Sequence, residues 1–188
     1  MNEALWLLGR GLGVSTLVLL TISMVAGIIT WQRSTPLQTP RFAAVDLRHR
    51  RASLVASGLL VAHILSLVLD QEAQLSWVDT VVPFLNARNP LWWGLGTLSL
   101  DILLVVVVTS LVKKRISHRV WRGIHWFSYL AWPVAVLHAF GGGTDATTVW
   151  FRLIAFTCIA AVGAAVGIRL NAAPATAIGG VRATRSPA

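Results

Sequence analysis

The amino-acid sequence predicts an all-α integral membrane protein, a bundle of five transmembrane helices with the N-terminus outside and the C-terminus in the cytoplasm. The prediction depends on an apolar composition, five long apolar runs and a one-sided distribution of basic residues. The 188-residue chain is 55% hydrophobic and 12% charged, and its mean hydropathy is +0.69. Soluble domains carry about 25% charged residues, so the composition favours a membrane protein.

Each apolar run is long enough to cross a bilayer, which takes about 20 helical residues. The predicted spans are 5–31, 50–69, 91–112, 120–140 and 149–170. Because they take up most of the chain, residues 1–170 are expected to form one domain. The remaining residues, 171–188, are rich in Ala, Pro, Gly and Arg, and this composition predicts a disordered cytoplasmic tail.

The segments between the spans differ in character. Residues 32–47 include Pro36 and Pro40 and are expected to form a loop on the cytoplasmic side. Residues 70–90 are too apolar for a plain linker, with Trp77 and Phe84 among them. We expect this segment to form an interfacial lid over the outer end of the bundle.

Charge predicts the orientation. Most of the 16 basic residues fall in the segments 32–51, 113–122 and 169–185, which would all lie on one side of a five-span bundle. The opposite side holds most of the acidic residues: Glu3, Asp70, Glu72, Asp79 and Asp145. By the positive-inside rule the basic side is cytoplasmic, as in a multi-pass protein of the plasma membrane. This distribution, rather than the net charge of +9, is informative, and no nucleic-acid partner is expected.

Four histidines lie in, or directly next to, two of the apolar spans at similar intervals. His49 and His63 are 14 residues apart, and His125 and His138 are 13 apart, so each interval covers about 20 Å of helix. The two spans run in the same direction, which places His49 level with His125 and His63 level with His138. Neutral imidazole is a common axial ligand of haem iron. The pattern therefore predicts two haem centres stacked across the membrane, and without a C-x-x-C-H motif the haem would not be covalently attached.

The fourth span complicates this pattern. A 13-residue interval leaves two side chains about 140° apart on a straight helix, so His125 and His138 would not share a face. Pro133 lies between them, and local rewinding at a proline could bring both to one face.

Other interpretations of the histidines are weaker. Unrelated histidines can form hydrogen bonds between transmembrane helices. Two pairs of polar imidazoles at matching depths in lipid would cost much free energy unless a shared ligand compensated them. Zinc is disfavoured because ligands about 20 Å apart cannot form a tetrahedral site. The fifth, His118, lies among basic residues and is expected to be a solvated loop residue.

Arg10 is a cation within the first span, where it needs a partner. We expect a propionate of the outer haem to be that partner, which would make Arg10 a cofactor-binding residue. The other candidate is Asp101, near the middle of the third span. Asp101 could instead relay protons, bind a quinone or make a structural pair.

Spans two to four resemble the ferric reductase-like transmembrane domain, which also forms the membrane core of NADPH oxidases. The matching stretches are Leu47-Arg48-His49-Arg50, Val61-Ala62-His63, Thr109-Ser110-Leu111 and Trp121-Arg122-Gly123-Ile124-His125-Trp126, followed by Tyr129 and His138. The first span, with Leu8-Gly9-Arg10-Gly11, is similar to the short stand-alone bacterial members of the family. The resemblance implies two b-type haems, the inner one on His49 and His125 and the outer one on His63 and His138.

The resemblance also implies a function. Full ferric reductases continue into FAD- and NADPH-binding domains, and we expect none here because the five spans leave little of the 188 residues. We therefore expect a haem-dependent electron-transfer subunit that takes electrons from a separate cytosolic flavoprotein or a membrane quinol. The acceptor would be extracytoplasmic, such as a flavoprotein, a ferric chelate or a repair enzyme. Two alternatives stay open: a terminal enzyme that reduces iron or oxygen at the outer haem, and a structural membrane subunit without cofactor.

Overall fold

The computed structural model describes residues 3–31 and 40–171, and this part of the chain is helical with no β-strand. Its α-helices are α1 (Glu3–Trp31), α2 (Pro40–Leu69), α3 (Pro90–Leu111), α4 (His118–Trp126), α5 (Ser128–Gly142) and α6 (Val149–Asn171), with a short 3₁₀ helix, η1 (Lys113–Arg115), after α3. The all-α prediction is confirmed for these residues. The predicted disordered tail, except Asn171 at the end of α6, lies outside them.

Four helices are long and apolar enough to cross a membrane. These segments are Glu3–Thr30, Ala44–Leu69, Pro90–Leu111 and Val149–Asn171, and they correspond to four of the five predicted spans. Many large apolar side chains on them are exposed, such as Leu104 and Phe156. Exposed apolar helix faces of this extent suit contact with lipid rather than water. The protein is therefore a multi-pass membrane protein.

The fourth predicted span is wrong as a single helix. The chain passes from α4 into α5 with an interruption at Phe127, while Pro133 lies inside α5. A proline cannot bond to the carbonyl four residues earlier, here that of Tyr129, and its ring crowds that carbonyl. The disturbance therefore falls on the N-terminal side of Pro133. The Ser128 hydroxyl adds to it by donating to the His125 carbonyl at 2.7 Å.

The predicted cytoplasmic loop is also too long at its C-terminal end. Helix α2 begins at Pro40, ten residues before the predicted start of the second span. Proline is favoured in the first turn of a helix because its missing N–H needs no partner there. As a result His49 lies well inside α2, and one unbroken helix carries both His49 and His63.

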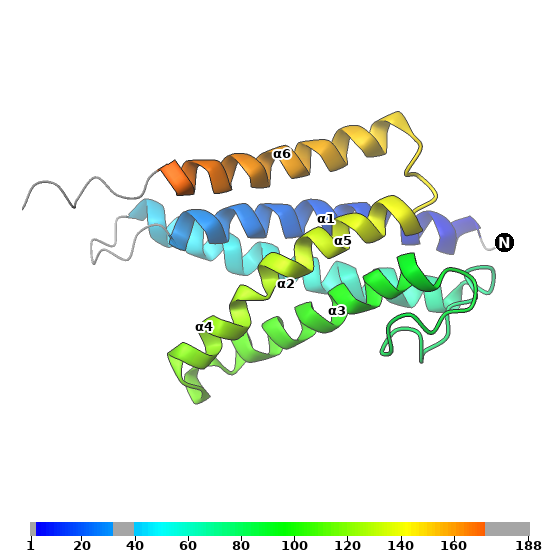
Figure 1. Ribbon diagram of the computed structural model, residues 1–188, viewed down its shortest axis with the longest axis horizontal. Coiled ribbons are helices and arrows are strands. Elements are labelled where there is room, and N and C mark those ends of the chain that lie inside the picture. Colours follow the sequence, from blue (N-terminus) through cyan, green and yellow to red (C-terminus); the bar gives the residue numbers. More distant parts are fainter. Residues whose placement is uncertain (1–2, 32–39, 172–188) are drawn as a thin grey trace, which may run out of the picture.

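The helices pack mainly as two pairs, α1 with α2 and α3 with α5, and α6 covers α1 on the outside. Figure 1 shows the 70–89 loop, the turn after α5 and the N-terminal end of α1 at one end of the bundle. The α3–α4 turn, the start of α2 and the end of α6 lie at the other end. The described basic segments therefore gather at one end, as the charge analysis requires. The direction in which the bundle crosses the membrane stays a prediction.

The best-packed part of the interior lies where α1, α5 and α6 meet. Leu17, Trp132, Val136 and Cys158 form a buried cluster. The indole Nε1–H of Trp132 donates to the Thr21 hydroxyl at 3.0 Å. This bond matters because a buried indole N–H without a partner would lose the free energy of its hydration.

The 70–89 segment is a folded loop rather than a plain linker. Thr97 on α3 donates to the Asp79 carbonyl at 2.7 Å, and Gly94 leaves room for the backbone of Phe84, which has a φ of 68°. Trp77 and Val81 remain 61% and 67% exposed. Their exposure at the end of a membrane-spanning bundle supports the interfacial lid, which stays a prediction.

Replacing Thr21 with Val should lower the free energy of unfolding by about 1–3 kcal/mol, because the buried Trp132 N–H loses its acceptor. Thermal unfolding of the purified protein in detergent would measure the change. Thr157→Val is the matched control, since exposed Thr157 bonds only to Leu153 of its own helix. Equal melting temperatures for the two variants would contradict the prediction.

The loop should loosen at acidic pH through Asp79. Its carboxylate accepts from the Ser76 backbone N–H at 2.9 Å, and this bond lowers the pKa of Asp79 below 3.8. A lowered pKa in the folded state stabilises the loop at higher pH, and the stabilisation is lost as the pH falls below about 4. The protection of residues 74–86 against hydrogen exchange, relative to the intrinsic rate at each pH, should fall there, whereas Asp79→Asn should remove this pH dependence. An unchanged profile in that variant would rule Asp79 out.

Candidate functional site

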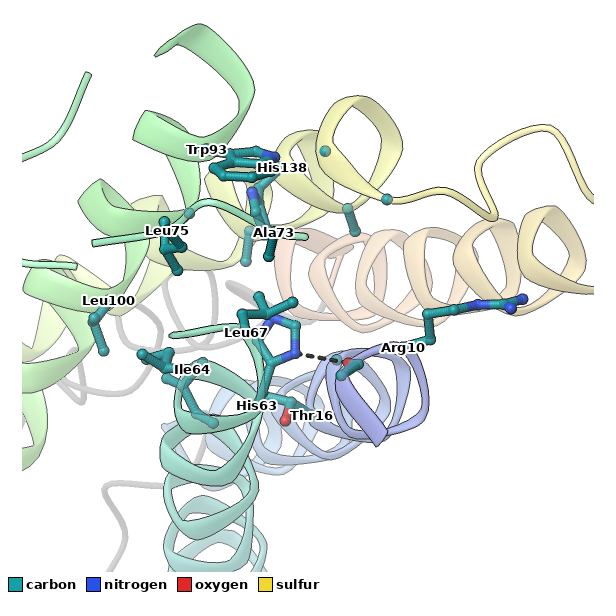
Figure 2. Close-up of a pocket in the computed structure, with 18 of the residues that line it drawn as sticks. Arg10, Thr16, His63, Ile64, Leu67, Ala73, Leu75, Trp93, Leu100 and His138 are labelled. Atoms are coloured by element: carbon teal, nitrogen blue, oxygen red, sulfur yellow. Dashed lines mark hydrogen bonds between the residues drawn. The ribbon is translucent and has the colours of Figure 1, made fainter. Parts of the chain in front are cut away.

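A cavity of about 550 Å³ lies between the two helix pairs toward the end of the bundle that carries the 70–89 loop. His63 from α2 and His138 from α5 both line it, and Figure 2 shows their imidazoles entering the same space from opposite sides. The structure therefore brings together the two histidines that were paired as the outer site. The volume is typical of small-molecule and cofactor sites.

The walls of the cavity are apolar over most of their area. They are built from side chains of α1, α2, α3 and α5, namely Leu17, Leu20, Leu60, Ile64, Leu67, Leu100, Leu103 and Ala135. Such walls suit a flat, largely apolar ligand and keep water away from the imidazoles. Polar groups are concentrated toward the loop end, where Arg10, Asp70, Arg88 and Asp145 line the cavity.

Main-chain carbonyls fix the rings of the outer pair. His63 Nδ1 is 2.8 Å from the Gly9 carbonyl on α1, and His138 Nδ1 is 2.8 Å from the Trp92 carbonyl on α3. A carbonyl can only accept, so each Nδ1 carries the proton and donates it. The proton then leaves the Nε2 lone pair available, which is the state that binds a metal.

The predicted inner pair also meets. The ring centroids of His49 and His125 are 6.0 Å apart, and their planes are nearly perpendicular at 82°. Two imidazoles that bind one metal ion from opposite sides through bonds of about 2 Å have centroids roughly 6 Å apart. His49 Nδ1 donates to the Ser23 carbonyl at 2.9 Å. The inner pair therefore has a separation that suits a shared metal ion.

His125 is held differently from the other three. Its ring stacks on Trp121 at 5.1 Å and 26°, and Trp121 Nε1 donates to the Ser110 hydroxyl on α3 at 3.3 Å. Its buried Nδ1 has no hydrogen-bond partner among the described residues. Ring contacts with Trp121 and His49, rather than a hydrogen bond from Nδ1, therefore orient this ring.

Thr16 supplies a further polar group to the cavity. Its side chain is 4% exposed and lines the space beside His63. The hydroxyl has no hydrogen-bond partner in the described part of the chain, although the hydroxyls of Thr21 and Thr30 bond to carbonyls of their own helix. An orphaned buried hydroxyl facing a cavity suits a ligand with polar atoms. Together with the paired imidazoles and the apolar walls, it makes the site fit haem.

The partner of Arg10 in the structure is Asp145, which was not among the two partners predicted from the sequence. Arg10 makes a two-bond ion pair with Asp145 in the turn between α5 and α6: Nε donates to Oδ2 at 2.6 Å, and Nη2 donates to Oδ1. The Trp6 ring lies 4.1 Å from the guanidinium. Asp101 on α3 is therefore not the partner in this structure, and a propionate would have to share Arg10 with Asp145.

The remaining titratable groups form no alternative metal centre. His118 is exposed at the first turn of α4, 5.6 Å from the Trp121 ring. The described residues contain no cluster of three or more His, Cys, Asp or Glu side chains that could hold an ion. The histidines meet in pairs, as axial haem ligation requires and tetrahedral zinc does not.

Sequence reasoning missed several members of this site. Asp145 was recognised only as an acid of the outer side, the Ser23 and Trp92 carbonyls carry no sequence signal, and Thr16 resembles any small residue of an apolar span. Asp145 could have been found, because it follows the fourth span directly and therefore lies at the same end of the bundle as Arg10.

These features define an all-helical multi-pass membrane protein with two pairs of histidines between its helices. Comparison with protein families gives a match to the family described as ferric reductase like transmembrane component, over residues 11–136. The chain belongs to this family, and the resemblance seen in the sequence is confirmed. The matched region contains His49, His63 and His125 and ends two residues before His138. Searches of curated proteins and of solved structures gave no match.

The Arg10–Asp145 pair should stabilise the outer end of the bundle. Because Asp145 is only 9% exposed, Arg10→Gln leaves a nearly buried carboxylate without its cation and should cost about 1–3 kcal/mol of unfolding free energy. The double variant with Asp145→Asn should lose less than the sum of the single variants. The exposed Asp46–Arg50 pair on α2 is the control, with an expected coupling of about 0.3–0.5 kcal/mol. Additive losses at Arg10 and Asp145 would contradict the assignment.

Proposed function

We propose that this protein carries electrons across the membrane through two b-type haems, each held by two histidines. The observation that supports it most is the meeting of four histidines as two pairs at different levels of the bundle. His49 and His125 have the centroid separation expected of two ligands of one metal ion. His63 and His138 line one apolar cavity.

His49 and His125 would hold the inner haem, and His63 and His138 the outer haem. When bound, haem supplies reversible one-electron chemistry at its iron. With both axial positions taken by protein ligands, such a site favours electron transfer over the activation of oxygen on the metal. The two sites lie at different depths on α2, so electrons would pass between them across the bilayer.

The chain's own residues prepare the outer site for its cofactor. The Gly9 and Trp92 carbonyls hold protons on Nδ1 of the two ligands, and the leucines of the wall exclude water. Arg10 uses Nε and Nη2 for Asp145, and neither bond occupies Nη1. That group is therefore available to donate to an outer propionate, which would make Arg10 a cofactor-binding residue.

The two ends of the bundle suit different partners. One end carries basic side chains such as Arg48, Lys113 and Arg119 and, by the positive-inside rule, faces the cytoplasm. A cytosolic flavoprotein with an acidic surface would be attracted there, and a quinol could reach the inner site from the bilayer. The acceptor would approach the other end, where the cavity extends to the 70–89 loop.

A terminal reductase is the second candidate. The polar end of the outer cavity favours it, because Glu72 and Arg88 of the 70–89 loop line the same cavity as the outer histidines. A small oxidant could bind there next to the outer haem. Rapid, saturable reoxidation of the reduced protein by a ferric chelate, weakened by Arg88→Ala, would favour this candidate over a conduit that needs a protein acceptor.

The purified protein should contain close to two b-type haems per chain, measured as the pyridine haemochrome. His63→Ala and His125→Ala should each lose about one of them, because each removes one axial ligand of a different pair. His118→Ala is the control and should keep both. The reduced-minus-oxidised spectrum of each variant would show which centre remains.

Protein that is made with haem supplied and contains none would overturn the proposal and leave a structural subunit as the better account. Loss of haem in His118→Ala would show that the losses reflect misfolding. Retention of both haems in His63→Ala would remove His63 from the ligand set.

A further inference from the structure

Three of the four paired histidines lie against a neighbouring helix in the same way. Each Nδ1 donates to a main-chain carbonyl, and four residues later that helix carries a glycine whose Cα faces the imidazole. The sets are His63 with the Gly9 carbonyl and Gly13, His49 with the Ser23 carbonyl and Gly27, and His138 with the Trp92 carbonyl and Gly96. We call each carbonyl and its glycine an imidazole seat.

The seats repeat with the spacing of the histidines. Gly13 and Gly27 on α1 are 14 residues apart, the same interval as His49 and His63 on α2. α1 and α2 pack side by side in opposite directions, so the two intervals run past each other in register. The third seat lies on α3, which packs against α5. The arrangement therefore recurs on two separate helix pairs.

The geometry of the helix explains why the residue four positions after each accepting carbonyl is glycine. A helical carbonyl accepts from the N–H four residues later, so a second donor to it must approach over that later residue. A side chain there would occupy the place of the ring. Glycine inside a helix is destabilising relative to alanine in soluble hosts, and here it allows the imidazole to reach the carbonyl.

The space at each seat differs in a measurable way. A Cβ added at Gly96 would lie 2.7 Å from His138 Cε1, one at Gly13 would lie 3.0 Å from His63 Cε1, and one at Gly27 would lie 3.4 Å from His49 Cε1. The first distance forces the ring to move, the second is tight, and the third is ordinary van der Waals contact. A Cβ at Gly11 would have no neighbour within 4 Å.

We infer that Gly96, Gly13 and Gly27 are positioning residues, which set the tautomer and direction of three imidazoles by letting them bond to backbone carbonyls. The hydrogen bonds and glycine contacts of the seats are present in the protein without any cofactor. Their role in tuning a metal centre rests on the proposed haem function. A bond from Nδ1–H to a carbonyl makes the imidazole a more basic ligand and favours the oxidised metal. His125 has no seat and serves as the internal comparison.

The first test reads the tautomers directly. Long-range ¹⁵N–¹H NMR of the full chain with labelled histidine, in detergent and in the diamagnetic reduced state, should assign the proton to Nδ1 in His49, His63 and His138. Exposed His118 should show mainly the Nε2–H form that imidazole prefers in water. A proton on Nε2 in the three seated histidines would overturn the inference. The deciding measurement is made on protein without haem, because ligation of iron through Nε2 would by itself leave the proton on Nδ1. It therefore remains informative if the haem proposal fails.

The second test uses alanine at the seats. Gly96→Ala and Gly13→Ala should raise the midpoint potential of the outer centre and shift its low-spin EPR signal, with the inner centre unchanged, because the weakened Nδ1 bond makes the ligand less basic. Gly96→Ala should have the larger effect. Gly27→Ala should shift the inner centre in the same sense but least, because the added Cβ would lie 3.4 Å from His49 Cε1. Gly11→Ala is the control and should leave both centres close to those of the unmodified protein. These shifts separate positioning from a loss of fold, which would disturb both centres together.

Two outcomes would overturn the inference while leaving the haem proposal intact. One is an unchanged outer centre in Gly96→Ala with the Nδ1 proton still present. The other is an equal shift in Gly96→Ala and Gly11→Ala, since Gly11 faces no imidazole. If Gly96→Ala fails to fold, Gly13→Ala tests the same centre at a site where the neighbour has to move by only a few tenths of an ångström.

Discussion

Hydrogen bonds from imidazole N–H groups to main-chain carbonyls are the interactions on which the arrangement of this bundle depends. Two of them join α2 to α1, at His49 and His63, and one joins α5 to α3, at His138. In hydrocarbon an imidazole N–H without an acceptor is expensive. The Ser23 hydroxyl lies 3.1 Å from His49 Nδ1, and the acceptor that all three histidines share is a backbone carbonyl. A helical backbone carbonyl, which already accepts one bond from its own helix, accepts the imidazole N–H through its second lone pair. The same bond that joins two helices also turns the ring toward the space between the pairs.

The division of the bundle follows from these contacts. α1 and α2 form one wall and α3 and α5 the other, and the outer cavity lies between them. The close-packed cluster of Leu17, Trp132, Val136 and Cys158 forms where α6 meets α1 and α5. At the outer end Arg10 and Asp145 tie α1 to the turn that leads into α6. Close packing where α1, α5 and α6 meet thus leaves the cavity between the two helix pairs open.

The histidines at the two sites are held by different contacts. Both outer histidines have carbonyl partners, whereas at the inner site only His49 does and His125 depends on stacking with Trp121. α4, which carries His125, is short, includes Arg119 and Arg122, and is separated from α5 at Phe127. The imidazole of His125 is therefore held by fewer hydrogen bonds than the other three. The outer site, enclosed by leucines and by the loop, is already shaped for its occupant.

The sequence by itself determined the membrane class, the positions of α1, α3 and α6 to within a few residues, and the pairing of His49 with His125 and His63 with His138. Long apolar runs and a fixed rise per residue are local properties, so they can be read without a fold. Only the tertiary structure decided that Arg10 meets Asp145 and that Gly13, Gly27 and Gly96 face imidazoles. These depend on which surfaces of distant helices touch. A backbone carbonyl or a glycine has no side chain from which its partner could be predicted. Its role becomes clear only when another helix packs against it.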